Sequence, residues 1–148
     1  MNVAMTDACV TDLSNRARLR KAVEGKDAIL RGVSALEYME MFVGYIKNEP
    51  VEIYTKTNLV DEDFDQRIVV DFKQIDYFKD GDVKCATFNQ VANDMLSEFE
   101  TMDDRALAEA LAGHYEENGH FEDLIIEPQY HSHFEEMKEW AREYYYKE

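Results

Sequence analysis

Two histidines near the C-terminus have the residue types and neighbours of a zinc site. His131 and His133 form an H-x-H pair followed by Glu135 and Glu136, and imidazole and carboxylate groups are common zinc ligands. In a helix, residues two apart point about 200° away from each other, so the pair could share an ion only in an extended segment. We therefore predict no metal ligands, and a small metal-dependent enzyme stays an alternative interpretation.

The sequence offers no pattern for nucleophilic or nucleotide chemistry. There is no G-x-S-x-G elbow, and Cys85 lies between Val83 and Thr87 in a predicted strand, which is typical of a buried structural thiol. The 6 glycines are widely separated, so a phosphate-binding glycine loop is excluded. Neighbouring carboxylates are frequent, but 32 acidic residues produce such pairs by composition alone. We predict no catalytic residues and no cofactor.

The net charge of −16 at pH 7 bears on the kind of partner that the chain can bind. A negative charge of this size repels phosphate backbones and attracts cationic surfaces, so direct DNA binding is not expected. The charge is uneven, because residues 15–31 carry six basic and two acidic side chains, whereas residues 94–148 carry 16 acids and four bases. The two interpretations are a solvated acidic surface and a docking face for a basic protein partner.

Seven residues are candidates for contacts with a protein partner. They come from the basic stretch, the second predicted helix and the acidic last helix: Arg16, Arg20, Tyr38, Glu40, Glu135, Glu136 and Glu139. Oppositely charged patches on one small domain can steer two different encounters. Neither a secretory signal nor a run of about 18 apolar residues occurs, so we expect a cytoplasmic protein without a membrane segment.

The length of 148 residues fits a single domain, 1–148, in which we expect residues 1–13 to be a disordered N-terminus. A first helix is predicted over residues 14–25. Ser34 and Glu37 have the spacing of a capping box, which predicts that a second helix begins at Ser34 and runs to Gly44.

The centre of the chain has the patterns of short strands. Residues 51–55 alternate between apolar and polar types, which predicts a half-buried strand. The acidic residues 61–65 indicate a loop, and the run 68–70 is too apolar and β-branched for one. The Asp80-Gly81 pair predicts a hairpin with a type I′ turn between two strands, over residues 75–79 and 83–87.

The second half has the pattern of three helices. Thr87 and Gln90 form a capping-box pair, and apolar residues then recur at helical spacing up to Phe99. Further helices are predicted over residues 103–118 and from either Pro128 or Ser132 onward. Five residues are predicted to lie in the core: Phe88, Val91, Met95, Leu96 and Leu111. The order of elements predicts an α+β fold, with a small, largely antiparallel sheet covered by a layer of helices.

Three segments resemble the C-terminal domain of AbiEi-type antitoxins, which belong to bacterial abortive-infection toxin–antitoxin systems. The first is residues 28–41, with a Ser-Ala-Leu helix start at residues 34–36. The second is residues 83–96, a strand leading to a Thr-capped helix with Asp-Met-Leu at its end. The third is the Ala- and Leu-rich helix over residues 106–115, and the likeness covers roughly residues 15–125.

The resemblance implies a non-enzymatic antitoxin-like protein that counteracts a nucleotidyltransferase-type toxin, by direct contact or indirectly. Members of that family usually carry an N-terminal winged helix-turn-helix that represses their own operon. Here only about 13 residues precede the first predicted helix, so we expect no such DNA-binding role. The alternatives are a small metal-dependent enzyme and a structural protein-interaction module.

Overall fold

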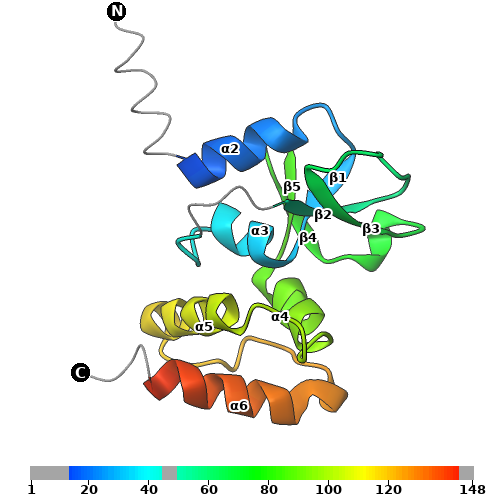
Figure 1. The fold of residues 1–148 in the computed structure, drawn as a ribbon. Coiled ribbons are helices and arrows are strands. Elements are labelled where there is room, and N and C mark those ends of the chain that lie inside the picture. The colour runs from blue at the N-terminus through cyan, green and yellow to red at the C-terminus, as the bar shows by residue number, and fades with distance from the viewer. Residues whose placement is uncertain (1–13, 45–49, 144–148) are drawn as a thin grey trace, which may run out of the picture.

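The computed structural model describes residues 14–44 and 50–143 (Figure 1). Its α-helices are α2 (Ser14–Val23), α3 (Gly32–Tyr38), α4 (Phe88–Leu96), α5 (Asp104–Asn118) and α6 (His131–Ala141), with 3-10 turns η1 (Phe72–Gln74) and η2 (Pro128–Tyr130). Its strands are β1 (Ala28–Leu30), β2 (Val51–Thr55), β3 (Phe64–Ile68), β4 (Tyr77–Asp80) and β5 (Val83–Ala86). Within the described ranges, none of the helices has the length and apolar character needed to span a bilayer. The prediction that residues 1–13 are disordered lies outside the described residues.

The five strands form one mixed sheet in the order β3-β2-β1-β5-β4. The β1–β2 and β4–β5 pairs are antiparallel, whereas the β1–β5 and β2–β3 pairs are parallel. The predicted α+β class is confirmed. The sheet is mixed rather than largely antiparallel, because the connection after β2 returns the chain to the starting end of that strand before β3 begins.

Strand β1 is the centre of the sheet although it has only three residues. Ala28, Ile29 and Leu30 are at most 3% exposed, and the strand pairs with β2 on one side and β5 on the other. Three consecutive apolar residues show neither a helical nor a strand period. The sequence pattern therefore does not predict the strand on which the sheet is built.

Helix α3 contacts β2, β5, α2, α4 and α5, so it is the hub of the packing. It begins at Gly32, before the predicted start, and Arg31 is its N-cap residue. Ser34 lies inside the helix, and its Oγ accepts a hydrogen bond from the backbone N–H of Glu52 at 2.9 Å. The predicted capping box is wrong because Ser34 ties the helix to β2 instead of capping it. The helix also ends at Tyr38, well before its predicted end.

The hairpin of β4 and β5 is confirmed, but its turn differs from the predicted one. Asp80 pairs with Val83, so the two-residue loop is Gly81 and Asp82. Gly81 has a φ of 62°, and Asp82 is not among the non-glycine residues with positive φ. Glycine with positive φ at the first central position is the arrangement of a type II′ turn, whereas type I′ needs positive φ at both positions.

Strand β3 occupies part of the segment predicted as a loop. Phe64 is buried and pairs with Val51 at the start of β2. At the other end, Ile68 closes the strand, while Val70 lies beyond it. The side chains of Ile68 and Val70 are both largely exposed, whereas their apolar character predicts burial.

The helices α4, α5 and α6 lie where the sequence predicts helices (Figure 1), and α4 has its predicted N-cap residue. The Thr87 hydroxyl accepts a hydrogen bond from the Gln90 N–H at 3.2 Å and so caps α4. Helix α5 starts at its predicted position, and η2, which begins at Pro128, leads directly into α6. Helix α5 packs against α6 and against α3. Of the predicted core residues, Phe88 is half-buried and four are at most 5% exposed: Val91, Met95, Leu96 and Leu111.

Candidate functional site

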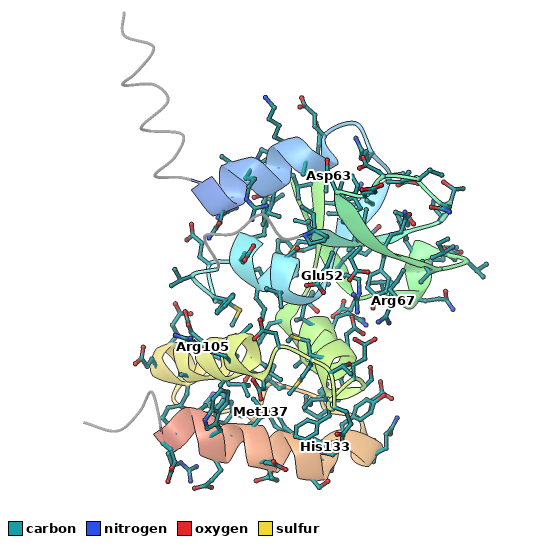
Figure 2. All side chains as sticks on the ribbon, viewed as in Figure 1. Glu52, Asp63, Arg67, Arg105, His133 and Met137 are labelled. Carbon is teal, nitrogen blue, oxygen red and sulfur yellow. The ribbon has the colours of Figure 1, made fainter. Side chains whose placement is uncertain are left out.

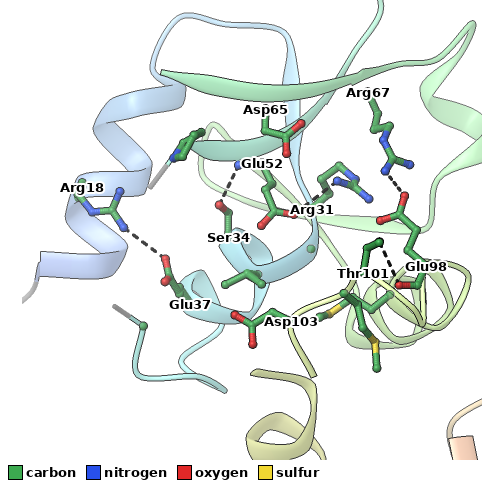
Figure 3. Close-up of a pocket in the computed structure, with 16 residues that line it drawn as sticks. Arg18, Arg31, Ser34, Glu37, Glu52, Asp65, Arg67, Glu98, Thr101 and Asp103 are labelled. Atoms are coloured by element: carbon green, nitrogen blue, oxygen red, sulfur yellow. Dashed lines mark hydrogen bonds and ion pairs between the residues drawn. The ribbon is translucent and has the colours of Figure 1, made fainter. Parts of the chain in front are cut away.

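A cleft of about 920 Å³ lies between one face of the sheet and helices α3 and α4 (Figure 3). Its lining includes residues of α2, α3, β2, β3 and α4, Arg31 between β1 and α3, and the connection between α4 and α5. Five carboxylates and three guanidinium groups line it: Glu37, Glu52, Asp65, Glu98 and Asp103, with Arg18, Arg31 and Arg67. The cleft is therefore a strongly charged site with an excess of acid.

The register of β2 and β3 explains why charged side chains gather on one face of the sheet. Side chains of a strand alternate between the two faces, so Glu52 and Tyr54 share a face of β2. Their partners in β3 are Asp65 and Arg67, which share the same face. Figure 2 shows Glu52 and Arg67 in the space between the sheet and α4. The opposite face of β2 carries the buried Ile53.

Arg31 is a buried cation at the inner wall of the cleft. It follows β1 directly and is 4% exposed. Its Nη1 lies 3.5 Å from Oε1 of Glu52, and its guanidinium carbon lies 5.1 Å from the centre of the Tyr54 ring. Its Nε has no hydrogen-bond partner among the described residues. A buried donor without an acceptor costs about 1 to 3 kcal/mol, so the fold keeps a costly charged group at this wall.

Glu52 is the carboxyl group whose ionisation the cleft changes most clearly. Burial raises the pKa of Glu52 to about 7, although the Arg31 guanidinium acts in the opposite direction. The negative charge of Asp65 raises this pKa further. A carboxyl group with a pKa near 7 exchanges its proton at neutral pH, which is unusual for a glutamate.

A chain of hydrogen bonds joins strand β2 to helix α4 beside Arg31. The Tyr54 hydroxyl donates to Oδ2 of Asp94 at 2.6 Å, and the Gln90 side-chain amide donates to Oδ1 of the same carboxylate at 2.9 Å. Burial, together with the bond to Asp94, raises the pKa of Tyr54 to about 12, so the phenol stays protonated. Burial also raises the pKa of Asp94. The Tyr54 hydroxyl and the Asp94 carboxyl group therefore join the sheet to α4 beside Arg31.

Two ion pairs frame the mouth of the cleft (Figure 3). The Arg18 guanidinium lies 3.3 Å from the nearly buried carboxylate of Glu37, which ties α2 to α3. Arg67 of β3 pairs with Glu98 just beyond α4. Both arginines are largely engaged by these acids. The arrangement can hold a ligand between charged walls, and Glu52 can accept or release a proton inside it.

Gly32 gives Glu52 the space for its position beside Arg31. A Cβ on Gly32 would lie 2.2 Å from Oε1 of Glu52, and the residue has a φ of 53°. Gly32→Ala should therefore cost about 1 to 2 kcal/mol of backbone strain and also displace the Glu52 carboxylate. Chemical denaturation measures the first effect, and an NMR titration of the Glu52 carboxyl group measures the second.

Gly25→Ala is the matched control for this substitution. Gly25 has a φ of 74° and no atom within 4 Å of the added Cβ, so it carries the backbone strain alone. We expect a normal Glu52 titration in the control and a shifted one in Gly32→Ala. An unshifted titration in both variants would contradict the tight packing between Gly32 and Glu52.

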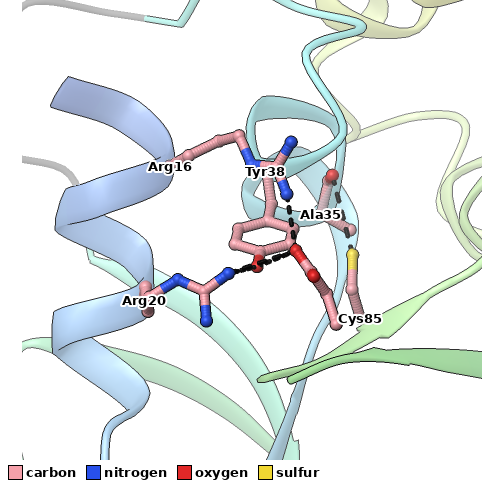
Figure 4. A network of polar contacts seen from close by, with 6 residues as sticks. Arg16, Arg20, Ala35, Tyr38 and Cys85 are labelled. Atoms are coloured by element: carbon pink, nitrogen blue, oxygen red, sulfur yellow. Dashed lines mark hydrogen bonds and ion pairs between the residues drawn. The ribbon is translucent and has the colours of Figure 1, made fainter. Parts of the chain in front are cut away.

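Three of the sequence-predicted contact residues form a partly exposed cluster with Asp80 (Figure 4). Arg16 Nη2 lies 2.6 Å from Oδ2 of Asp80, and Arg20 Nη2 donates to the Tyr38 hydroxyl at 2.7 Å. The Tyr38 hydroxyl in turn donates to Oδ2 of Asp80 at 2.7 Å, and this bond holds the pKa of Asp80 below its usual range. The cluster joins α2, α3 and β4. Glu40 lies outside it, is exposed and has a φ of 62°.

Cys85 lies beside this cluster and is fully buried (Figure 4). Its Sγ lies 3.8 Å from the carbonyl oxygen of Ala35. Burial raises the pKa of the Cys85 thiol to about 12, so the thiolate needed for nucleophilic attack does not form at neutral pH. The predicted burial of this thiol is confirmed, and Cys9 lies outside the described residues.

The three candidate glutamates of α6 lie on its exposed face: Glu135, Glu136 and Glu139. Two of them have ion pairs within the helix, Glu135 with Lys138 at 2.8 Å and Glu139 with Arg142 at 3.6 Å. The structure thus places them together, apart from the cleft and from the cluster around Tyr38.

The histidines of the H-x-H pair have separate surroundings. Nε2 of His131 bonds the carbonyl oxygen of Ile126 at 2.8 Å, and the His133 ring stacks on Phe99 with 3.9 Å between ring centroids. Figure 2 shows His133 and Met137 on the side of α6 that faces the other helices. Among residues 14–44 and 50–143, no group of three His, Cys, Asp or Glu side chains could hold a metal ion.

Known proteins do not extend this description. No protein-family model matches the chain, and comparisons with curated proteins and with solved structures find no match.

The cleft residues that matter most do not emerge from sequence patterns. Arg31 directly follows the short apolar run of β1, and Glu52 is a polar position of a predicted alternating strand, where a solvent-facing side chain is the ordinary expectation. The alternating polar positions of β2 are Glu52 and Tyr54, and the pattern does not show that their face of the sheet is also covered. The parallel pairing with β3 that brings Asp65 and Arg67 beside them depends on tertiary structure.

Proposed function

We propose that this chain is a non-enzymatic, antitoxin-like protein that counteracts a nucleotidyltransferase-type toxin in a bacterial abortive-infection system. The cleft at Arg31 is the surface through which it acts. Two of the segments that resemble AbiEi-type antitoxins, residues 28–41 and 83–96, contribute to the walls of this cleft. The observation that carries the proposal is the buried Arg31 guanidinium beside Glu52, because a fold does not need an incompletely paired charge for stability.

The partner is a protein rather than free nucleic acid. The net charge of −16 and the excess of carboxylates in the cleft both oppose the approach of a phosphate backbone. They favour a partner surface with exposed basic groups. The chain counteracts the toxin either by contacting it directly or by acting on a target that both proteins share.

Growth rescue tests the proposed function. The chain is expressed together with a nucleotidyltransferase-type toxin, and colony formation is compared with that of cells that express the toxin alone. We expect rescue by the wild-type chain and no turnover of nucleotides by the purified chain. Absence of rescue by a folded wild-type chain would contradict the proposal.

A second candidate function, acid–base catalysis in the same cleft, is favoured by the pKa of Glu52, which is raised to about 7. Glu52→Gln separates the two functions, because glutamine keeps the shape of the side chain but cannot exchange a proton. A binding role retains rescue in this variant, whereas catalysis by Glu52 loses it. Circular dichroism of the purified variant confirms that the fold is kept.

A further inference from the structure

Strand β3 leaves one side of its backbone open at an edge of the sheet. It is the outermost strand and, among the described residues, pairs only with β2. The Val69 N–H donates to the Thr55 carbonyl, and the Val51 N–H donates to the Asp63 carbonyl, each at 2.8 Å. Backbone groups alternate in direction along a strand, so those of Gln66 and Ile68 point away from β2.

The opposite edge of the sheet, formed by β4, carries a charged cluster at its last residue. At β4, Asp80 is held by Arg16 and Arg20 of helix α2 and by Tyr38. Proteins commonly cover or charge an edge strand to prevent pairing with other chains. Figure 1 shows β3 on the side of the sheet away from α5 and α6.

Large β-branched side chains are exposed around this open edge. Ile68 is 57% exposed, Val70 is 90% exposed and Val60 is 85% exposed. The Leu59 N–H donates to the side chain of Gln66 at 3.0 Å, which keeps the segment of Val60 beside β3. An added strand uses two features of a sheet edge, namely free backbone groups and exposed apolar side chains beside them.

The charge around the edge defines the chemistry of the added strand. Four acidic residues, all exposed, stand at the start of β3: Asp61, Glu62, Asp63 and Asp65. Arg67 is the basic residue of this strand, and its guanidinium group is paired with Glu98 in the cleft. A second copy of the chain would bring these acids against a molecule that also carries a net charge of −16. The complementary occupant is an extended segment with alternating basic and β-branched residues.

We propose that the β3 edge binds a basic, extended segment of a partner protein by strand addition. This site shares Asp65 with the lining of the cleft, but it does not depend on the proposed function or on the identity of the toxin. Backbone hydrogen bonds to Gln66 and Ile68 hold the segment, the exposed valines and Ile68 contact its apolar side chains, and residues 61–65 attract its basic ones.

The test uses a fluorescein-labelled peptide of alternating valine and lysine, about six residues long, and the full chain. Fluorescence anisotropy measures its affinity, and amide hydrogen exchange followed by NMR locates it. We expect binding and slower exchange at Gln66 and Ile68. A peptide in which glutamate replaces lysine should not bind, because residues 61–65 repel it.

Matched variants separate the edge from general charge attraction. Ile68→Ser with Val70→Ser should weaken binding at least about tenfold, whereas Val43→Ser with Ile125→Ser should leave it unchanged. The control side chains are each 77% exposed, and a circular dichroism spectrum checks both folds. No binding, equal weakening by the control pair, or exchange effects confined to α6 or the cleft would overturn the proposal. Concentration-dependent dimers that protect the same amides would overturn it in favour of a second copy.

Discussion

Leu96→Ala should lower the free energy of unfolding by about 2 to 5 kcal/mol. Leu96 is the last residue of α4 and is 1% exposed, in the helix that packs against α3. Removing its side chain loses transfer free energy and leaves a cavity that the fixed neighbours fill only in part. Urea denaturation followed by circular dichroism measures the change, and an unchanged m-value shows that the unfolding transition is the same.

Ile125→Ala is the control for that substitution, because Ile125 is 77% exposed. It should change stability by less than about 0.5 kcal/mol. If Leu96→Ala changed stability as little as this control, the packing of α4 described above would be wrong.

The second large effect is a pH dependence that Glu52 produces. Its pKa rises from 4.5 to about 7 on folding, mainly through burial. Between these pH values the unfolded chain has lost the Glu52 proton while the folded chain still holds it. The contribution of Glu52 to stability is therefore present in full below about pH 4.5, falls as the pH rises, and is lost above about pH 7. The expected loss is on the order of 1 to 3 kcal/mol.

Glu52→Gln isolates this contribution from the other carboxyl groups. Asp27, Asp80 and Asp123 have lowered pKa values and titrate below this window, while the pKa of Asp94 is raised. These four carboxyl groups are present in both the wild type and the variant, so their effects on stability cancel in the comparison. We expect the stability difference between the two chains to change steadily from pH 4.5 to pH 7. A difference that is constant over this range would contradict the raised pKa of Glu52.

Local signals predict the helical half of the fold well. The Thr87 and Asp103 caps bond the N–H groups of the residues three positions later, and the apolar stripe of α4 is buried as its spacing predicts. These features depend on residues close in sequence. The α+β class follows from them and from the hairpin at Gly81.

The sheet and the cleft depend on contacts that sequence patterns do not report. Strand β1 has three residues, too few for a period, yet both of its neighbours pair with it. Ser34 has the spacing of a cap but bonds the backbone of β2, because helix α3 begins at Gly32. Arg31 meets Glu52 only after β1 and β2 have paired. A candidate site built from segments far apart in the sequence is therefore visible in the structure alone.

The most direct measurement compares growth rescue by two charge variants in the presence of the nucleotidyltransferase-type toxin. One variant is Glu98→Lys in the cleft, and the other is Glu136→Lys on α6, so each changes the net charge equally. Circular dichroism checks that both chains are folded. If the cleft is the acting surface, the first variant loses rescue and the second retains it. Retained rescue by the cleft variant with loss by the α6 variant would contradict the proposed role of the cleft and transfer it to the acidic helix.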